Sequence, residues 1–242
     1  MFELGTTEHW WEIAKKYPKL SHQNQILKPL GYSFVIKLIE ENDLQKILEF
    51  GHGAGSYLFD IFKDKREMWG LDDIIAGSGV SESSLQETKN KHSHVKFVKG
   101  LLGQDLKDLP QNYFDLICSV SVIEHIPIDQ LELVLSEIYK YLKPGGIFAS
   151  SYDVYYKQNT KPLFDAIEKN KFIWLKPRET MNVFWENWLN PDSTGICEKL
   201  LKRVIIENPM IVTEFFMWKI EREKRLTPPN FFSVLVAAKK PD

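Results

Sequence analysis

Cysteine is scarce in this chain of 242 residues, in which only Cys118 and Cys197 occur. Two cysteines so far apart in the sequence make neither a disulfide framework nor a cysteine-rich zinc site. They are typical of reduced thiols, so we expect a protein of the cytoplasm.

Long apolar runs and dense basic blocks are also lacking. No apolar stretch approaches the ~20 residues that cross a bilayer, and residues 1–8 lack the basic and apolar regions of a signal peptide. The formal net charge is -2, without the Lys/Arg clusters that mark nucleic-acid binding. We therefore expect a cytoplasmic protein that binds neither a membrane nor nucleic acid.

Glycine, by contrast, is concentrated in residues 46–56, with the sequence KILEFGHGAGS. A short apolar run precedes Gly51, Gly53 and Gly55, and apolar residues return at helical spacing from Tyr57 onward. This pattern predicts a buried strand, a glycine turn and a helix. Such a turn lets the backbone approach a ligand closely, and the helix start offers N–H groups to an anion. An ordinary tight turn is the alternative interpretation.

Strands and helices alternate through residues 46–154. We predict strands at 67–71, 94–100, 114–121 and 146–154, and a helix at 129–142 whose apolar residues share one face. This alternation indicates a parallel sheet with right-handed crossovers, whose ligands bind outside the carboxyl ends of the strands.

The flanking segments extend the same single domain. Residues 1–45 are predicted to form a helical cap, whose second helix (21–41) is interrupted near 29–31. Residues 155–204 continue an aromatic-rich insertion that we expect to cover the substrate, with a helix near its end. Residues 205–242 then read as a closing antiparallel hairpin, with strands at 211–221 and 231–238.

A carboxylate marks the tip of the second predicted strand. Asp72 lies 23 residues after Glu49, where nucleotide-type crevices place an acid that binds the ribose hydroxyls. Nicotinamide dehydrogenases and class I S-adenosylmethionine methyltransferases both use this arrangement. The glycine spacing here is Gly-x-Gly-x-Gly, and Ser56 stands where the dehydrogenase fingerprint requires glycine.

Four ordered motifs over about 110 residues resemble those of class I methyltransferases that act on small molecules. They are residues 49–55, Asp72, residues 114–127 (FDLICSVSVIEHIP) and residues 142–146 (LKPGG). The resemblance implies an α/β fold with a doubly wound, mostly parallel seven-stranded sheet and an antiparallel last strand. It also implies S-adenosylmethionine as the cofactor and S-adenosylhomocysteine as the product.

The resemblance assigns roles by position. Backbone at the three glycines would carry the methionine portion, with Glu49 near its ammonium group and His52 in the same turn. Asp72 would hold the ribose, and Asp73 would border the adenine. Ser119 and Val120, at the end of the fourth strand, would lie beneath the sulfonium. The family's acidic residue after the third strand is absent. Adenine would rest on Leu101 and Leu102, or find a polar partner in Gln104 or Asp105.

His125 is the candidate general base, because the family motif places it beside the pocket and imidazole accepts protons near neutral pH. A structural histidine that satisfies loop carbonyls is the alternative. Flanking residues that could contact the substrate are Trp10, Trp11, Tyr17, His22, Tyr152 and Tyr155. Only Asp153 offers a carboxylate at the fifth strand, so we expect no metal.

The sequence therefore predicts methyl transfer by in-line displacement to an oxygen or nitrogen of a small molecule. A sugar or sugar-phosphate metabolite is one candidate acceptor. Two alternatives stay open: a nicotinamide-dependent oxidoreductase, and a catalytically silent methyltransferase-like binding subunit. We expect a monomer or a homodimer.

Overall fold

The computed structural model describes residues 2–4, 7–21, 27–63, 65–73, 80–104, 106–155, 161–175 and 231–242. Its strands are β1 (Phe2–Leu4), β2 (Lys46–Phe50), β3 (Glu67–Asp72), β4 (Lys96–Lys99), β5 (Phe114–Val120), β6 (Leu142–Tyr155), β7 (Ile173–Trp174) and β8 (Phe231–Lys239). Its α-helices are α1 (Thr7–Lys16), α2 (Leu27–Glu41), α3 (Tyr57–Ile61), α4 (Glu82–Lys91), α5 (Leu131–Tyr141) and α6 (Lys161–Lys169), joined by the short 3-10 helices η1 (Pro18–Ser21), η2 (Ile123–His125) and η3 (Ile128–Gln130).

One sheet runs through these residues in the order β1-β8-β6-β5-β2-β3-β4, with β7 also paired to β8. The pairs from β4 to β6 are parallel, whereas β8 is antiparallel to β6, β1 and β7. Because β2 pairs with both β3 and β5, the strand order reverses at β2, which is where α/β sheets bind their ligands. The predicted fold class is confirmed.

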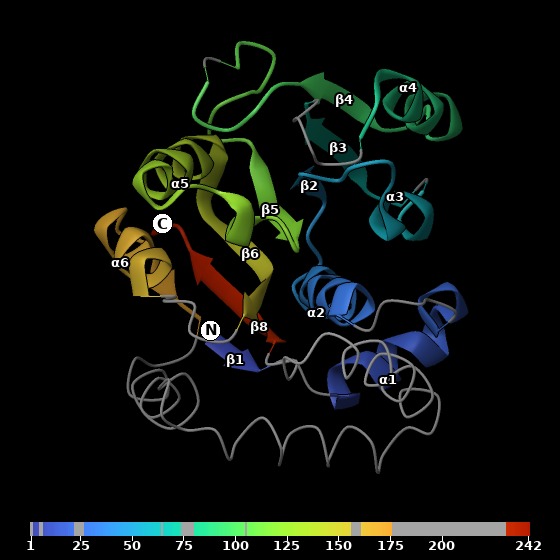
Figure 1. The fold of residues 1–242 in the computed structure, drawn as a ribbon, viewed down its shortest axis with the longest axis horizontal. Coiled ribbons are helices and arrows are strands. Elements are labelled where there is room, and N and C mark those ends of the chain that lie inside the picture. Colours follow the sequence, from blue (N-terminus) through green and yellow to red (C-terminus); the bar gives the residue numbers. More distant parts are fainter. Residues whose placement is uncertain are drawn as a thin grey trace, which may run out of the picture.

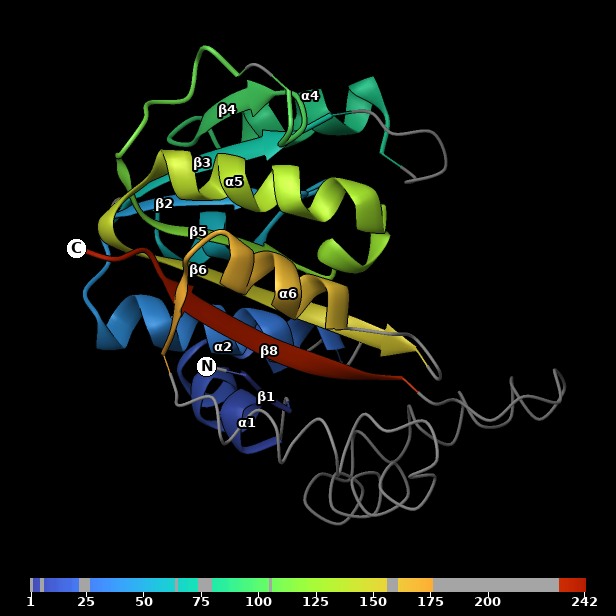
Figure 2. The ribbon, with the colours of Figure 1, turned by 90° about the vertical axis from the view of Figure 1, so that its left-hand side faces the viewer.

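Helices cover both faces of the sheet. Figure 1 shows α2, α3 and α4 on one face and α5 and α6 on the other, and Figure 2 shows α5 and α6 lying across β5, β6 and β8. Side chains alternate between two apolar cores, because neighbouring residues of a strand point to opposite faces. Leu48 and Phe50 of β2 join the core under α5, and Ile47 joins the core under α2.

The N-terminal segment departs from the predicted helical cap at its start. Residues 2–4 form β1, which pairs with β8 in the antiparallel register Phe2↔Val236. The predicted interruption of the second helix at 29–31 is also wrong, because α2 continues from Leu27 to Glu41. Pro29 lies in its first turn, where proline is tolerated. Gly31 lets the helix approach β6, since a Cβ there would lie 2.1 Å from Ser151 Oγ.

The segment after β6 contains α6 and β7, neither of which the sequence pattern predicted. The buried residues of α6, among them Leu163 and Ile167, pack into the core under α5. The predicted strand at 211–221 and the predicted helix near residue 200 lie outside the described residues. In the part of the chain that the structure covers, β1 and β7 both pair with the edge of β8 that lies opposite to β6.

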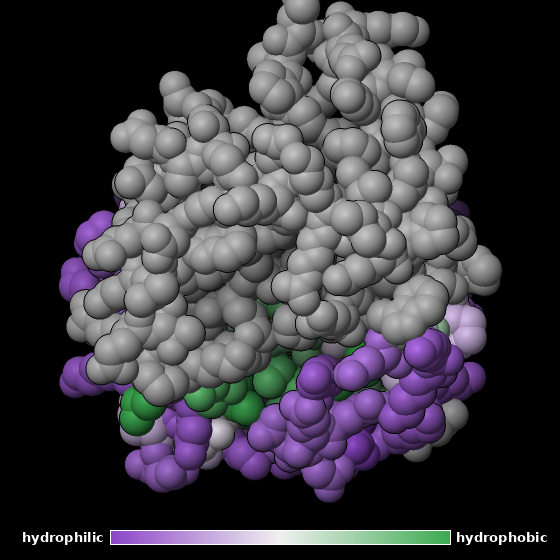
Figure 3. All heavy atoms as spheres, turned by 90° about the horizontal axis from the view of Figure 1, so that it is seen from below, coloured by the Kyte–Doolittle hydropathy of each residue, from purple (hydrophilic) through white to green (hydrophobic). Residues whose placement is uncertain are grey.

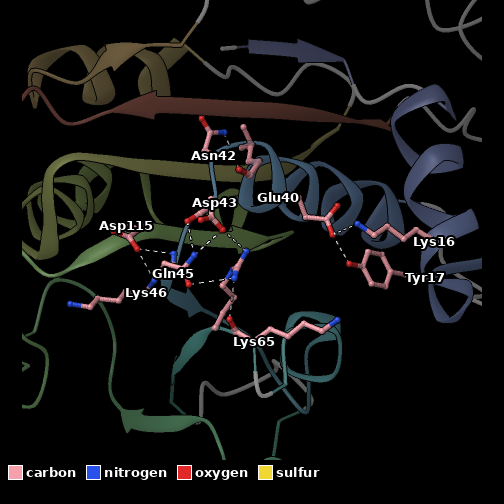
Figure 4. A network of polar contacts seen from close by, with 11 residues as sticks. Lys16, Tyr17, Glu40, Asn42, Asp43, Gln45, Lys46, Lys65 and Asp115 are labelled. Atoms are coloured by element: carbon pink, nitrogen blue, oxygen red, sulfur yellow. Dashed lines mark hydrogen bonds and ion pairs between the residues drawn. The ribbon is translucent and has the colours of Figure 1, made fainter.

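A polar network joins the amino ends of β2 and β5 (Figure 4), and Lys143 extends it to β6. One oxygen of Asp115 accepts hydrogen bonds from the backbone N–H groups of Gln45 and Lys46, each at 2.8 Å, and its other oxygen pairs with Lys143. Asp115 therefore ties the starts of β5, β2 and β6 together. This edge is opposite to the carboxyl ends where a ligand would bind.

Apolar and polar residues lie beside each other on one face of the molecule. In the view from below, Figure 3 shows a band of apolar atoms beside a broad hydrophilic rim. Within the described ranges, no helix combines the length and the apolar character that a transmembrane segment requires. The predicted cytoplasmic location stays a prediction.

Asp115→Asn should lower the free energy of unfolding by about 1–3 kcal/mol, because a buried oxygen that accepts two N–H groups loses its charge. Burial alone would raise the pKa of Asp115, but Lys143 and the two backbone donors lower it below its ordinary value. The stabilisation should be present at neutral pH and disappear as the pH falls through that lowered pKa. Urea unfolding at several pH values measures it.

Asp43→Asn is the matched control, because Asp43 pairs with Arg66 but its side chain is 79% exposed. Exposed ion pairs contribute ~0–1 kcal/mol. Equal losses for the two variants would contradict the role given to Asp115.

Candidate functional site

The three glycines of the β2–α3 loop have different surroundings. Gly51 has a φ of +69°, and a Cβ on it would lie 2.6 Å from the side chain of Val122. Gly55 has a φ of +153°, and apart from its chain neighbours no atom of the described residues lies within 4 Å of the corresponding position. Gly51 is therefore required by packing against the loop after β5, whereas Gly55 borders open space where a ligand could approach the backbone.

Asp72 anchors this loop to the end of β3. Its Oδ2 accepts a hydrogen bond from the Gly53 N–H at 2.5 Å, and its Oδ1 accepts one from the Asp73 N–H at 2.8 Å. Asp72 is only 8% exposed. The predicted loop and the predicted acid therefore form one unit at the carboxyl edge of the sheet.

Glu49 lies under this unit, fully buried between β2 and α2. Tyr32 of α2 donates a hydrogen bond to Glu49 Oε1 at 2.9 Å, and the Ser56 hydroxyl donates to Oε2. Burial raises the pKa of Glu49 to about 7, although both hydroxyls favour its charged form. Glu49 was predicted to face the crevice beside a ligand ammonium group. Its carboxyl group instead binds side chains of the protein core.

Helix α3 is shorter than its apolar pattern indicated, since it ends at Ile61. Ser56 caps it: its hydroxyl oxygen accepts the Leu58 N–H at 3.0 Å. The protein therefore satisfies one N–H group of the first turn itself, and the predicted role of the helix start in holding an anion stays a prediction.

His52 belongs to the turn but its ring packs inward. It makes edge contacts with Phe59 and Phe97, with ring centroids 5.4 Å apart in each case. Burial lowers the pKa of His52, so a neutral ring is favoured. The side chain therefore supports the loop, and only its backbone lies with the neighbouring glycines.

Serines line the ends of β5 and β6. The hydroxyls of Ser119 and Ser150 lie 3.0 Å apart, and both residues are fully buried. Val120, on the other face, packs toward Gly31 of α2. Ser121 turns the chain at a φ of +54°, and its N–H donates to Ser151 O at 3.1 Å. These contacts fix the strand ends that the resemblance places beneath the reacting group.

The loop after β4 carries the predicted adenine contacts. Leu101 and Leu102 are half-buried, and Leu102 packs against the core under α5. The side-chain oxygen of Gln104 accepts the Leu101 N–H at 3.2 Å. This bond shapes the loop, so an adenine amino group would compete with Leu101 for that oxygen. Asp105 lies outside the described residues.

The candidate catalytic and acceptor residues follow β5 and β6. His125 ends η2 with an exposed side chain. Tyr152 is buried on β6, where burial and the nearby charge of Glu124 raise its pKa far above the ordinary value. The structure therefore keeps the Tyr152 phenol neutral, as a hydrogen-bond donor.

Tyr17 lies beside the end of α2, away from the other candidate residues. Its hydroxyl donates to Glu40 Oε1 at 2.5 Å, and Lys16 pairs with the same oxygen at 2.7 Å, so the end of α1 is held to the end of α2 (Figure 4). Glu40 is eight residues beyond Tyr32 along α2, which corresponds to about 12 Å. This placement argues against a role for Tyr17 in substrate binding.

The remaining predicted substrate contacts belong to the N-terminal segment and to the end of β6. His22 and the side chains of Trp10, Trp11 and Tyr155 lie outside the described part of the structure.

Comparison with known proteins identifies the domain. Residues 48–150 match the model of the methyltransferase domain family. In sequence over these residues, and in its fold, the chain resembles class I S-adenosylmethionine-dependent methyltransferases. The predicted resemblance is confirmed, and neither the nicotinamide enzyme nor the silent subunit gains support.

Individual relatives are similar to parts of this chain. The sterol 24-C-methyltransferase of Yarrowia lipolytica is 34% identical over 106 residues, which is 43% of this chain and 26% of that protein. The phosphoethanolamine N-methyltransferase of Plasmodium falciparum is 23% identical over 69% of this chain and 64% of that protein. The chain thus spans about a quarter of the sterol relative's length and under two thirds of the other's.

A solved structure extends the likeness to the whole fold. The TehB-like S-adenosylmethionine-dependent methyltransferase from Corynebacterium glutamicum superposes with a TM-score of 0.55, covering 98% of this chain and all of that one. The sequence identity is 16%, so this likeness concerns the fold.

The site fits S-adenosylmethionine. Within the described residues, Gly55 leaves room against the backbone, and Asp72 places a carboxylate where the resemblance predicts the ribose. Among the residues that the structure describes, no three His, Cys, Asp or Glu side chains are grouped as a metal site would need. Metal-independent chemistry stays a prediction.

Three residues of the site were missed by sequence reasoning. Ser56 could have been found, because a serine before an apolar helical pattern signals an N-cap. Tyr32 and Val122 gave no such signal, since their roles depend on contacts with Glu49 and Gly51 that only the folded chain creates.

Gly55→Ala should weaken S-adenosylmethionine binding at least tenfold, because the added methyl occupies space next to the backbone where the cofactor fits. The unfolding free energy should fall by about 1–3 kcal/mol, the usual cost of a side chain in a backbone region that favours glycine. Calorimetric titration and urea unfolding measure the two quantities.

Gly51→Ala serves as the contrasting variant. The methyl group collides with Val122, so this variant should lose more stability than Gly55→Ala. Unchanged cofactor affinity in folded Gly55→Ala would contradict the assignment of that space to the cofactor.

Proposed function

We propose that this chain transfers the methyl group of S-adenosylmethionine to an oxygen or nitrogen of a small-molecule acceptor. The observation that carries the proposal is the bond between the Gly53 N–H and the Asp72 carboxylate. It joins the two cofactor motifs at the edge of the sheet, within the residues that match the methyltransferase family.

When bound, S-adenosylmethionine supplies an activated methyl group, so the protein's task is mainly to position the acceptor and exclude water. We assign the ribose hydroxyls to Asp72, and the methionine portion to backbone at Gly53 and Gly55. Asp73 and Leu101 border the adenine, and Ser119 and Val120 support the floor of the site.

His125 is proposed as the general base for an oxygen acceptor. It ends the short η2 helix, which comes soon after β5 and whose first residue, Ile123, is buried and fixes its position. Its exposed imidazole is accessible to an acceptor that enters over the strand ends. Tyr152, kept neutral by burial and by Glu124, is proposed to donate a hydrogen bond to the acceptor rather than to remove its proton.

The acceptor class is open to direct test. The relatives named above are a sterol methyltransferase and a phosphoethanolamine methyltransferase. Sterols and phosphobases are therefore two candidate classes of methyl acceptor for this chain, and sugars or sugar phosphates are a third. The buried aromatic ring of Tyr152 beside a carboxylate favours an acceptor with an apolar part and a polar or cationic group.

A screen with S-adenosylmethionine labelled in its methyl group tests the proposed activity. The chain is incubated with sterols, phosphobases, sugars and a metabolite extract, and the labelled product is identified. We expect label in one small-molecule class, and at least a tenfold lower rate with Asp72→Asn, whose amide supplies one acceptor oxygen instead of two. Cofactor binding without transfer to any acceptor would favour the silent binding subunit.

His125→Ala should lower kcat at least tenfold and leave cofactor affinity unchanged, since general base catalysis contributes about 10²–10⁴-fold. Gln130→Ala, an exposed change on the same loop, is the control. Full activity of His125→Ala would remove the base assignment.

A further inference from the structure

Three buried side chains connect the helical cap to the cofactor loop. Tyr32 comes from α2, Glu49 from β2, and Ser56 from the end of the glycine loop. Glu49 is 1% exposed, Tyr32 5% and Ser56 8%. The Ser56 oxygen also caps α3 through Leu58, so the bonds run without a break from the cap helix to the helix after the loop.

The hydrogen bonds of this cluster suit an ionised Glu49. The Tyr32 hydroxyl donates to one carboxylate oxygen and the Ser56 hydroxyl donates to the other, so each oxygen of the ionised group accepts a hydrogen bond. If Glu49 carries a proton, its own O–H group becomes a donor and needs an acceptor. One of the two hydroxyl groups, from Tyr32 or Ser56, then loses the ionised oxygen to which it donated. Burial favours the neutral form and the two donors favour the charged form, which leaves the two states close in free energy.

Among the residues that the structure describes, few charges act on the cluster. From α2, Lys28 is exposed and acts only at a distance; from β3, Asp72 repels the negative charge of Glu49. Cys118 of β5, the register neighbour of Glu49, is fully buried and neutral because burial raises its pKa. Tyr57 of α3 packs edge-on against Tyr32 at 5.0 Å and adds no charge.

We propose that the Tyr32–Glu49–Ser56 cluster is a proton-linked positioning device for the cofactor loop, in which Glu49 releases a proton when the positively charged cofactor binds. The inference rests on the proposed function, because it concerns the same cofactor site. Glu49 is a positioning residue: it acts through Ser56 and through its charge, without touching the reacting atoms.

The charge balance gives the direction of the effect. Glu49 is buried beneath the loop that Asp72 holds, and the negative charge of Asp72 favours a protonated Glu49. S-adenosylmethionine brings a sulfonium in addition to its amino-acid charges, whereas S-adenosylhomocysteine lacks the sulfonium. A nearby positive charge favours the ionised carboxylate. Binding of the methyl donor should therefore release a proton, and binding of the demethylated product should release fewer.

By linkage, a ligand that lowers the pKa of a group binds more tightly as the pH rises through that pKa. Affinity for S-adenosylmethionine should increase with pH around pH 7, by at most about tenfold per unit, while affinity for S-adenosylhomocysteine changes less. The site would thus discriminate between substrate and product cofactor better above neutral pH.

Titration calorimetry of the full chain at pH 7 tests this without relying on turnover. Each cofactor is titrated in phosphate and in Tris, whose ionisation enthalpies differ, and the difference in heat gives the protons released. We expect up to about half a proton for S-adenosylmethionine, the share of Glu49 that is protonated near its pKa, and clearly less for S-adenosylhomocysteine.

Variants assign the proton to Glu49. Glu49→Gln should abolish the difference between buffers, and Tyr32→Phe, which removes one donor to the carboxylate, should shift the maximum release to higher pH. Glu40→Gln is the matched control: Glu40 also accepts from a tyrosine, Tyr17, but at the opposite edge of the sheet. It should leave the proton release unchanged.

The outcomes distinguish failure of the proposed function from failure of the proton linkage at Glu49. Absence of S-adenosylmethionine binding would overturn the proposed function itself. Binding with equal heats in both buffers, or equal proton release for the two cofactors, would overturn the inference and leave the function intact. If Glu49→Gln does not fold, the wild-type comparison and Tyr32→Phe still decide: an unshifted maximum in Tyr32→Phe would contradict the role of the cluster.

Discussion

The hydrogen bond from the Gly53 N–H to the Asp72 carboxylate is the interaction on which the site depends. It connects the turn after β2 to the end of β3, two neighbouring strands whose parallel pairing brings their carboxyl ends to one edge. Without it, a loop with positive φ at Gly51, Gly53 and Gly55 would have many alternative conformations. With it, backbone and carboxylate are held together before a ligand arrives.

The loop is supported from below as well as from the side. Val122, from the loop after β5, occupies the space that a side chain at Gly51 would need. Glu49 and Ser56 fasten the loop to β2 and, through Tyr32, to α2. The helical cap therefore contributes to the shape of the cofactor site through a buried contact, and this support is independent of any contact that the cap makes with an acceptor.

The sequence carried enough information for the parallel core and for the cofactor motifs. The strands from β2 to β6 are marked by apolar runs, and the glycine turn and Asp72 lie at their ends, where topology alone brings them together. Strand β1 could not be predicted, because three residues are too few to show a period. The sequence pattern predicts a helix interruption at Gly31, whereas the structure shows that the missing side chain allows close approach to Ser151. Glu49 was placed toward the ligand because sequence spacing does not show the tyrosine that meets it from α2.

The central claim is that Asp72 holds the ribose of S-adenosylmethionine at the edge formed by β2 and β3. A crystal structure of the chain with bound S-adenosylhomocysteine tests it most directly. We predict both ribose hydroxyls within hydrogen-bond distance, about 2.5–3.0 Å, of the Asp72 carboxylate, and the methionine portion against Gly53 and Gly55. A ligand bound elsewhere, or a ribose turned away from Asp72, would contradict the account.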